Sequence, residues 1–276
     1  MKPEEIKKAV KAGYAKVALH NLPCCGTGSS CCGSSNLAED ISRKAGYGDE
    51  ELNAVPEGAN LGLGCGNPVA LASLGEGEVV LDLGSGAGFD CFLAASKVGS
   101  TGRVIGVDMT PEMVEKATRN AREGDFENVD FRLGEIESIP VGEKQVDVVI
   151  SNCVINLSPD KNKVFGEAFR VLKPGGRLMV SDIVLLKELP EAIRHSVEAY
   201  VGCIAGAAMK EEYLAAIQSA GFQEIKVLGE DVYPIDFLAA DPMAQAVCAD
   251  SNISAETSEE LSSSVASIKV SARRPG

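Results

Sequence analysis

VVLDLGSGAGFD, residues 79–90, is the most informative stretch of this sequence. An unbroken apolar run ends at three alternating glycines, and the residues that follow, 91–95, are typical of a helix. Buried parallel strands have such apolar runs, and glycines allow a sharp turn and a close approach to a ligand. The helix that begins there offers unpaired N–H groups. The stretch therefore predicts a strand, a ligand-binding turn and a helix.

The glycine spacing and two acidic residues indicate the class of ligand. Dinucleotide enzymes use G-x-G-x-x-G, which seats pyrophosphate on the helix N-terminus. This chain instead has G-x-G-x-G at Gly84, Gly86 and Gly88. Asp82 precedes the glycines, and Asp108 closes the next apolar run, at about the distance where a second strand presents a carboxylate to a ribose. A carboxylate at Asp82 suits an amino group and a sulfonium, so the pattern favours S-adenosylmethionine over NAD.

Composition limits the function classes. The chain has 276 residues, 45% of them hydrophobic, which suits one large α/β domain with extensions. The formal net charge of −14 argues against nucleic acid as a partner, because phosphate binding needs a basic face. No apolar run approaches the roughly 18 residues of a membrane span. The polar residues 1–5 carry no signal-peptide pattern, so we expect a cytoplasmic protein.

The nine cysteines stand out in a chain expected in the cytoplasm. Disulfide frameworks are rare in that compartment, so metal binding or thiol chemistry is favoured. His20 and His195 lack a partner motif, which disfavours His-centred catalysis. Four cysteines form a CC-x5-CC cluster in a Gly/Ser loop: Cys24, Cys25, Cys31 and Cys32.

Strand and helix patterns alternate from residue 79 onward. The predicted strands are residues 79–83, 104–108, 129–132, 146–150, 177–183 and 224–229. The predicted helices between them are residues 89–97, 111–123, 161–171, 189–201 and 210–220. This alternation predicts a doubly wound, Rossmann-like, mostly parallel sheet with right-handed crossovers. Residues 265–270 alternate as a seventh strand, expected to insert antiparallel beside the sixth. We expect residues 1–76 to form a helical, Cys-rich N-terminal cap on an α/β domain of residues 77–273.

Six phrases resemble the arsenite methyltransferases, a family of class I S-adenosylmethionine methyltransferases. They are GANLGLGCGNP (58–68), LDLGSGAGFD (81–90), GVDMTPEM (106–113), LGEIE (133–137), SNCVINLSPDK (151–161) and YVGCIAG (200–206). The resemblance is specific because Cys65, Cys153 and Cys203 fall inside these phrases. It implies an enzyme that transfers methyl groups from S-adenosylmethionine to trivalent arsenic. Members of the family are often longer, with a C-terminal domain.

The resemblance implies that Cys65, Cys153 and Cys203 hold the arsenic. Ligands of open α/β sheets lie outside the carboxyl ends of the strands, and Cys153 comes just after the predicted fourth strand. Three converging thiolates suit a soft, thiophilic centre. The lone pair of arsenic attacks the methyl group directly, so the protein has to position the reactants and exclude water.

The other cysteines have competing interpretations. A free cysteine often packs as a small hydrophobe, which is our expectation for Cys91 and Cys248, and the Ala-rich surroundings of Cys203 suit a core residue as well. The CC-x5-CC cluster can capture metalloid, serve as a resolving thiol pair, or be a loop with incidental thiols. The family uses a fourth cysteine upstream of Cys65, for which Cys31 and Cys32 are both candidates.

Ten residues are expected to bind the cofactor. We expect the glycines to run along its methionine portion, Asp108 to take the ribose hydroxyls, and Met109 to pack on the adenine. The full set is Asp82, Gly84, Ser85, Gly86, Gly88, Asp108, Met109, Glu135, Ile136 and Asn152. Asp160 and Lys161 are expected to begin a helix rather than to form part of a site.

Two alternative functions stay open at this stage. A C-methyltransferase of the same fold, acting on a quinone-type substrate, needs an apolar pocket and no convergent thiols. A non-catalytic metalloid-binding protein binds arsenite but not S-adenosylmethionine. The favoured hypothesis is an arsenite methyltransferase that acts on thiol-bound trivalent arsenicals, with thioredoxin or small thiols as reductant.

Overall fold

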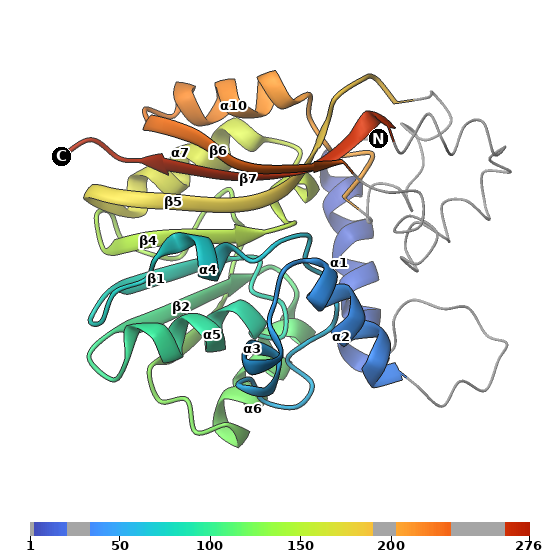
Figure 1. Ribbon diagram of the computed structural model, residues 1–276, viewed down its shortest axis with the longest axis vertical. Coiled ribbons are helices and arrows are strands. Elements are labelled where there is room, and N and C mark those ends of the chain that lie inside the picture. Colours follow the sequence, from blue (N-terminus) through green and yellow to red (C-terminus); the bar gives the residue numbers. More distant parts are fainter. Residues whose placement is uncertain (1–2, 21–33, 190–202, 233–262) are drawn as a thin grey trace, which may run out of the picture.

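A seven-stranded sheet forms the centre of the computed structural model, which describes residues 3–20, 34–189, 203–232 and 263–276 (Figure 1). The strands are β1 (Val79–Leu83), β2 (Arg103–Asp108), β3 (Val129–Leu133), β4 (Val146–Asn152), β5 (Leu172–Leu185), β6 (Gln223–Val232) and β7 (Val265–Arg273). Their order is β3-β2-β1-β4-β5-β7-β6. Strands β1 to β5 pair in parallel, and β7 lies antiparallel between β5 and β6. The predicted fold class is confirmed, including the antiparallel last strand.

The helices follow the predicted alternation. They are α1 (Pro3–His20), α2 (Ser34–Lys44), α3 (Asp49–Asn53), α4 (Pro68–Ala72), α5 (Phe89–Val98), α6 (Pro111–Glu123), α7 (Lys161–Val171) and α10 (Lys210–Ser219), with a 3-10 turn at Ile155–Leu157. Thr110 is the N-cap residue of α6, and Pro111 is its first helical residue. The helix predicted at 189–201 lies, apart from Leu189, outside the described residues. None of the described helices is both long and apolar enough to cross a membrane.

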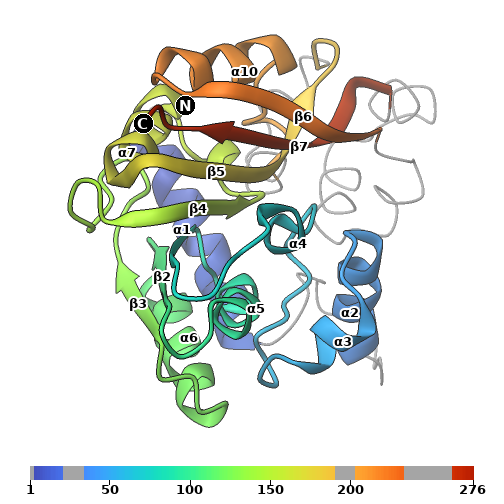
Figure 2. The ribbon, with the colours of Figure 1, turned by 60° about the vertical axis from the view of Figure 1, so that its left-hand side comes forward.

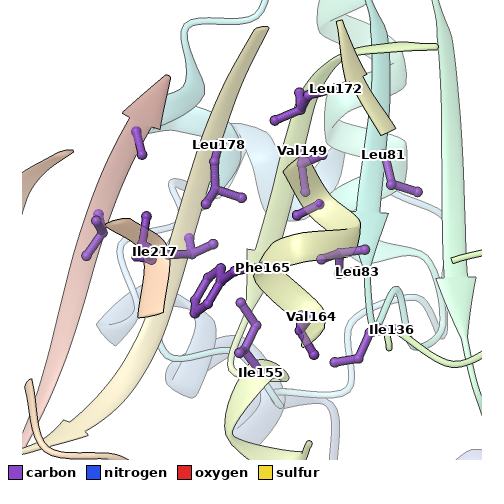
Figure 3. Packing of buried hydrophobic residues seen from close by; sticks show 14 of the residues in the cluster. Leu81, Leu83, Ile136, Val149, Ile155, Val164, Phe165, Leu172, Leu178 and Ile217 are labelled. Atoms are coloured by element: carbon purple, nitrogen blue, oxygen red, sulfur yellow. The ribbon is translucent and has the colours of Figure 1, made fainter. Parts of the chain in front are cut away.

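Two apolar layers cover the sheet, because successive side chains of a strand point to opposite faces. Leu81 and Leu83 of β1 face α7 and α10, where Phe165 and Tyr213 pack edge to face at 5.3 Å (Figure 3). Val80, which precedes Leu81 in β1, belongs to the layer on the opposite face of the sheet, which α4 and α5 cover (Figure 2). Full burial of such a side chain stabilises the fold by about 1.5–3 kcal/mol.

Strand β5 is longer than predicted. The sequence predicts a strand that begins at residue 177, but Leu172, the first residue of the LKPGG segment (172–176), already pairs with Val146 of β4. Gly175 takes a left-handed φ of 77° within the strand, and its N–H donates to the carbonyl of Arg274. The proline and glycines therefore bend a continuous strand, and the C-terminal residues complete its hydrogen bonding.

The N-terminal helix α1 lies across the end of the sheet to which β4 points (Figure 1). Val10 and Val17 on one face of α1 are buried. Lys7 forms ion pairs with Glu135 and Glu137, at 2.8 and 2.9 Å. These contacts hold α1 over the carboxyl ends of the parallel strands, where ligands of open α/β sheets bind.

Candidate active site

A pocket opens under α1 at the carboxyl ends of β1, β2 and β4. It is lined by Lys7, Val10 and Tyr14 of α1, by residues 59–64, by Asp82 and residues 84–87, by residues 108–110, by Ile136 and Glu137, and by residues 152–154. These segments are far apart in the sequence, and most of them belong to the phrases singled out above. The pocket is therefore assembled from the loops that follow neighbouring strands.

The glycine turn after β1 forms the floor of this pocket. Gly84 has a φ of 70°, and a Cβ atom there would lie 2.3 Å from Val154. Gly86 also has a left-handed φ, of 52°, but a Cβ atom there would meet nothing within 4 Å. The space above Gly86 is open for a ligand. Ser85 lines the pocket, and its buried hydroxyl has no hydrogen-bond partner in the described part of the chain.

Gly88 takes a different place from the other two glycines. It is not among the residues that line the pocket. A Cβ atom at Gly88 would lie 2.7 Å from Phe92 and 2.8 Å from Phe131, so this glycine allows α5 to pack closely. Its N–H donates to the carbonyl of Ser85 and closes the turn.

Four carboxyl groups line this pocket, and three of them, those of Asp82, Asp90 and Asp108, belong to the glycine turn and the strands and helix beside it. Burial raises the pKa of Asp108, and it raises the pKa of Asp90 to about 6. Burial and the charge of Asp90 raise the pKa of Asp82 well above its usual range. A cationic ligand stabilises the charged form of such buried, neighbouring acids. The pocket thus suits a positively charged molecule.

Asp108 holds the glycine turn in place. One carboxylate oxygen accepts the N–H of Gly86 at 3.0 Å, and the other accepts the N–H of Thr110 at 2.8 Å. Each carboxylate oxygen can accept more than one hydrogen bond. Asp108 therefore keeps acceptor capacity toward the pocket.

The wall of the pocket formed by Met109, Ile136 and Glu137 contains a different glutamate from the one predicted. Met109 and Ile136 line the pocket, as expected of residues that pack on a base. Glu135 does not line it; this side chain is exposed and pairs with Lys7. Glu137 lines the pocket instead, buried, and accepts a hydrogen bond from the Ser158 hydroxyl at 2.7 Å. The LGEIE phrase contains both glutamates, so the sequence signal was present but did not distinguish them.

Asn152 connects the pocket to the loop that carries Cys65. Its side-chain oxygen accepts the N–H of Cys65 at 3.0 Å. Its amide donates to the carbonyl of Gly66, the hydroxyl of Tyr47 and the carboxylate of Asp90. Tyr47, which sequence reasoning missed, also donates to Asp90 at 2.6 Å. Asn152 thus fixes one thiol relative to the acidic side of the pocket.

Cys65, Cys153 and Cys203 come together beside the pocket. All three are buried, with 7%, 7% and 5% of their surface exposed. The Cys153 thiol is hydrogen-bonded to the thiols of both Cys65 and Cys203. These bonds and burial raise the pKa of Cys153 well above its usual range, and burial raises the pKa of Cys65. The thiols of Cys65 and Cys153 are therefore protonated at neutral pH.

The three thiols form one cluster, in which Cys153 interacts with both of the other thiols. No group of three or more ligating side chains in the described ranges is arranged to hold a metal ion. Tyr14 of α1 is hydrogen-bonded to the Cys203 side chain. Cys153 and Cys203 both have left-handed backbones, with φ of 58° and 64°.

The remaining cysteines separate into two groups. Cys91 lies within α5 and is fully buried, as expected of a core residue, and its thiol donates to Asp82 at 3.2 Å. The cysteines that lie outside the described residues are Cys24, Cys25, Cys31, Cys32 and Cys248. The described cysteines are all free thiols.

Comparisons with known proteins agree with this geometry. The model of a methyltransferase domain family matches residues 74–221. The arsenite methyltransferase of Halobacterium salinarum is 47% identical over 235 residues, which are 83% of this chain and 60% of that protein. The crystal structure of CrArsM, an arsenic(III) S-adenosylmethionine methyltransferase from Chlamydomonas reinhardtii, matches with a TM-score of 0.62 and 32% identity, over 86% of this chain and 73% of that one. The chain belongs to the arsenite methyltransferase family.

A second arsenite methyltransferase is similar to this chain over most of its length. The arsenite methyltransferase of Aquipseudomonas alcaligenes is 38% identical over 207 residues, 72% of this chain and 58% of that protein. The chain therefore spans about 60% of the length of these two curated relatives. These similarities do not favour the quinone-type alternative considered from the sequence.

Proposed function

We propose that this chain transfers a methyl group from S-adenosylmethionine to trivalent arsenic held by the thiols of Cys65, Cys153 and Cys203. One observation supports this most directly: Cys153 lines the acidic pocket, and its thiol also interacts, without a covalent bond, with the thiols of Cys65 and Cys203. A methyl donor in the pocket and an acceptor on Cys153 are therefore adjacent. The products are methylated arsenicals and S-adenosylhomocysteine.

The pocket fits the proposed cofactor. When bound, S-adenosylmethionine supplies an electrophilic methyl group on a sulfonium. Asp82 and Asp90 provide negative charge for its cationic groups, and Asp108 provides acceptors for the ribose hydroxyls. The open space above Gly86 lets a ligand approach the backbone closely. Met109 and Ile136 supply the apolar surface for the adenine.

Protonated thiols suit the binding of the substrate. Each new As–S bond replaces a Cys S–H bond and an As–O or As–S bond of the incoming arsenical. The proton leaves with the displaced group, as water or as a free thiol. Because the charge is balanced in each exchange, the buried site needs no strong base. The raised pKa values of Cys65 and Cys153 are compatible with this chemistry.

Methyl transfer needs positioning rather than proton removal. The arsenic lone pair attacks the methyl carbon, an As–C bond forms, and the carbon–sulfonium bond breaks. Arsenic becomes pentavalent and takes up the positive charge. It returns to the trivalent state when a further thiol attacks one arsenic-bound sulfur: two sulfurs join as a disulfide, arsenic gains two electrons, and a proton is released. Cys31 or Cys32 is our candidate for this thiol, with thioredoxin or small thiols reducing the disulfide afterwards.

The domain division belongs to the same proposal. Residues 1–76 act as a cap and residues 77–273 as the catalytic domain. Two contacts support the cap: Lys7 pairs with Glu137, and Tyr14 bonds to the Cys203 side chain. Both bring α1 over the pocket and the thiols, which excludes water from the reacting atoms. We also propose a cytoplasmic location.

Product analysis tests the function. The protein is mixed with arsenite, methyl-labelled S-adenosylmethionine and excess glutathione, and arsenic species are separated and counted. We expect labelled methylarsenicals with the wild-type chain and none with Cys153→Ser. Tight binding of arsenite without any affinity for S-adenosylmethionine would instead indicate a metalloid-binding protein. Label transferred to a quinone-type acceptor but not to arsenic would indicate a C-methyltransferase.

A further inference from the structure

Lys161 lies between the two loops that carry Cys153 and Cys203. It is the first residue of α7, which Asp160 caps by accepting the N–H of Lys163, as expected from the sequence. The Lys161 side chain, however, does not extend into solvent. Its ammonium donates to the carbonyl of Gly206 at 2.7 Å and to the carbonyl of Ser158 at 3.3 Å. One cation therefore joins the segment after Cys153 to the segment after Cys203.

The segment that carries Cys203 has further attachments among the described residues: Tyr14 is hydrogen-bonded to the Cys203 side chain, and Ile204 belongs to a buried cluster with residues of α1 and β5. The Cys203 thiol donates to the carbonyl of Cys153, and the N–H of Leu185 donates to the carbonyl of Ala208. Cys203 itself has a left-handed φ of 64°. A non-glycine residue keeps this conformation only where its surroundings enforce it. The bond from Lys161 to Gly206 is a charged contact in this segment, three residues after Cys203.

A buried acid lies near Lys161. Asp182 of β5 is 1% exposed, and when it is ionised its charge attracts the Lys161 ammonium. Asp182 cannot turn toward the thiols, because it accepts hydrogen bonds from Asn156, Tyr213 and the N–H of Ile183. The attraction therefore acts from a fixed point. It adds to the two hydrogen bonds that place the lysine head group between the loops.

We propose that Lys161 is a positioning residue that sets the separation of Cys153 and Cys203, so that both thiols reach one arsenic atom. The proposal rests on the proposed function and deepens it, because a once-methylated arsenical needs two protein thiols at one spacing. Lys161 touches neither thiol and acts through the two loop carbonyls. Its removal should loosen the thiol pair and leave the cofactor pocket intact.

The test uses phenylarsine oxide, which exchanges its oxygen for two neighbouring thiols and releases water. The full-length chain carries serine in place of Cys24, Cys25, Cys31, Cys32 and Cys65, which leaves Cys153 and Cys203 as the adjacent pair. Dissociation constants for phenylarsine oxide are measured by competition with dithiothreitol. Calorimetry gives the affinity for S-adenosylmethionine in the same variants. No methyl transfer is involved, so the result does not depend on whether the chain methylates arsenite.

In this background, Lys161→Met should weaken phenylarsine oxide binding at least tenfold and change S-adenosylmethionine affinity less than twofold. Lys161→Arg, which keeps the charge and the donors, should restore most of the lost affinity. Lys163→Met, an exposed lysine on the same helix, should have no effect. Unchanged binding in Lys161→Met would overturn the proposal. If Lys161→Met and Lys161→Gln both lose S-adenosylmethionine binding as well, Lys161 is a general structural residue and the proposal is equally overturned.

Discussion

The Cys203 thiol donates a hydrogen bond to the backbone carbonyl of Cys153, with 2.9 Å between sulfur and oxygen. The N–H of Cys153 in turn donates to the carbonyl of Ser181 in β5. Both cysteines have left-handed backbones, a conformation that costs about 1–3 kcal/mol for a non-glycine residue. Packing and hydrogen bonds must offset this cost. The two thiols are therefore held side by side by the fold, before any substrate binds.

Cys153 and Cys203 should both be required for every methylation step. Two thiols are the fewest that hold a once-methylated arsenical, and a serine oxygen is a harder, weaker ligand for arsenic. Cys153→Ser and Cys203→Ser should each lower the initial rate on arsenite and on methylarsenite at least a hundredfold. The rates are measured with excess thiol present.

Cys91→Ser is the matched control for these substitutions. A serine hydroxyl can still donate to Asp82, as the Cys91 thiol does. Activity should therefore stay within a few-fold of the wild type. A Cys91→Ser variant as inactive as Cys153→Ser would show that our separation of core cysteines from site cysteines is wrong.

The N-terminal cysteines should matter for arsenite more than for methylarsenite. Arsenite offers three positions for sulfur, and one of them is occupied by carbon after the first transfer. Replacing Cys24, Cys25, Cys31 and Cys32 by serine should slow the first methylation much more than the second. The effect of Cys65→Ser should lie between this change and Cys153→Ser. Equal losses on both substrates would indicate that the N-terminal cysteines have a general structural role.

Point substitutions are a sharper test of the N-terminal segment than truncation. Removal of the first 36 residues would also remove α1, and with it Lys7, Val10 and Tyr14 from the wall of the pocket. Loss of these side chains would weaken cofactor binding by itself. The serine substitutions leave α1 in place.

Asp108→Ala should weaken S-adenosylmethionine binding at least tenfold. A charge-assisted hydrogen bond to the ribose is worth about 1.5–3 kcal/mol. The substitution also removes the acceptor of the Gly86 N–H, which organises the glycine turn. Asp108→Asn, which keeps one oxygen, should cost less. Calorimetry measures the affinity of both variants for S-adenosylmethionine. Phenylarsine oxide binding should stay the same, because Asp108 is not part of the thiol cluster. Wild-type cofactor affinity in Asp108→Ala would contradict the ribose assignment.

Asp182 should make the folded chain less stable as the pH rises. Burial raises the pKa of Asp182 to about 7, above its usual value of 3.8. Between pH 3.8 and about pH 7, Asp182 has lost its proton in the unfolded chain but keeps it in the folded chain. The favourable contribution of the protonated acid is therefore complete below about pH 4 and is lost as the pH rises through 7.

Asp182→Asn removes this pH dependence while keeping an acceptor for Ile183 and Asn156. The free energy of unfolding of this variant relative to the wild type should rise by about 2 kcal/mol between pH 5 and pH 8. Urea titrations at the two pH values measure it. A constant difference between variant and wild type would mean that Asp182 does not titrate in this range.

The sequence by itself determined the elements and their order. The apolar run at 79–83, the glycine turn and the Thr110-Pro111 helix start are local signals, and β1 and α6 begin and end where these signals place them. Strand–helix alternation then fixes a parallel sheet, because a parallel connection needs a crossover. The same alternation places Asp82, Asp108 and Cys153 at one edge, since the carboxyl ends of parallel strands meet there.

Only the tertiary structure decided which side chains meet at that edge. Glu137 rather than Glu135 faces the pocket, and Lys161 extends to Gly206, 45 positions along the chain. Tyr47 bonds to Asn152 across 105 positions. Local signals reflect the preferences of neighbouring residues, whereas these contacts depend on how distant loops pack against one another. The pairing of side chains across loops is therefore a property of the assembled fold, and no spacing in the sequence contains it.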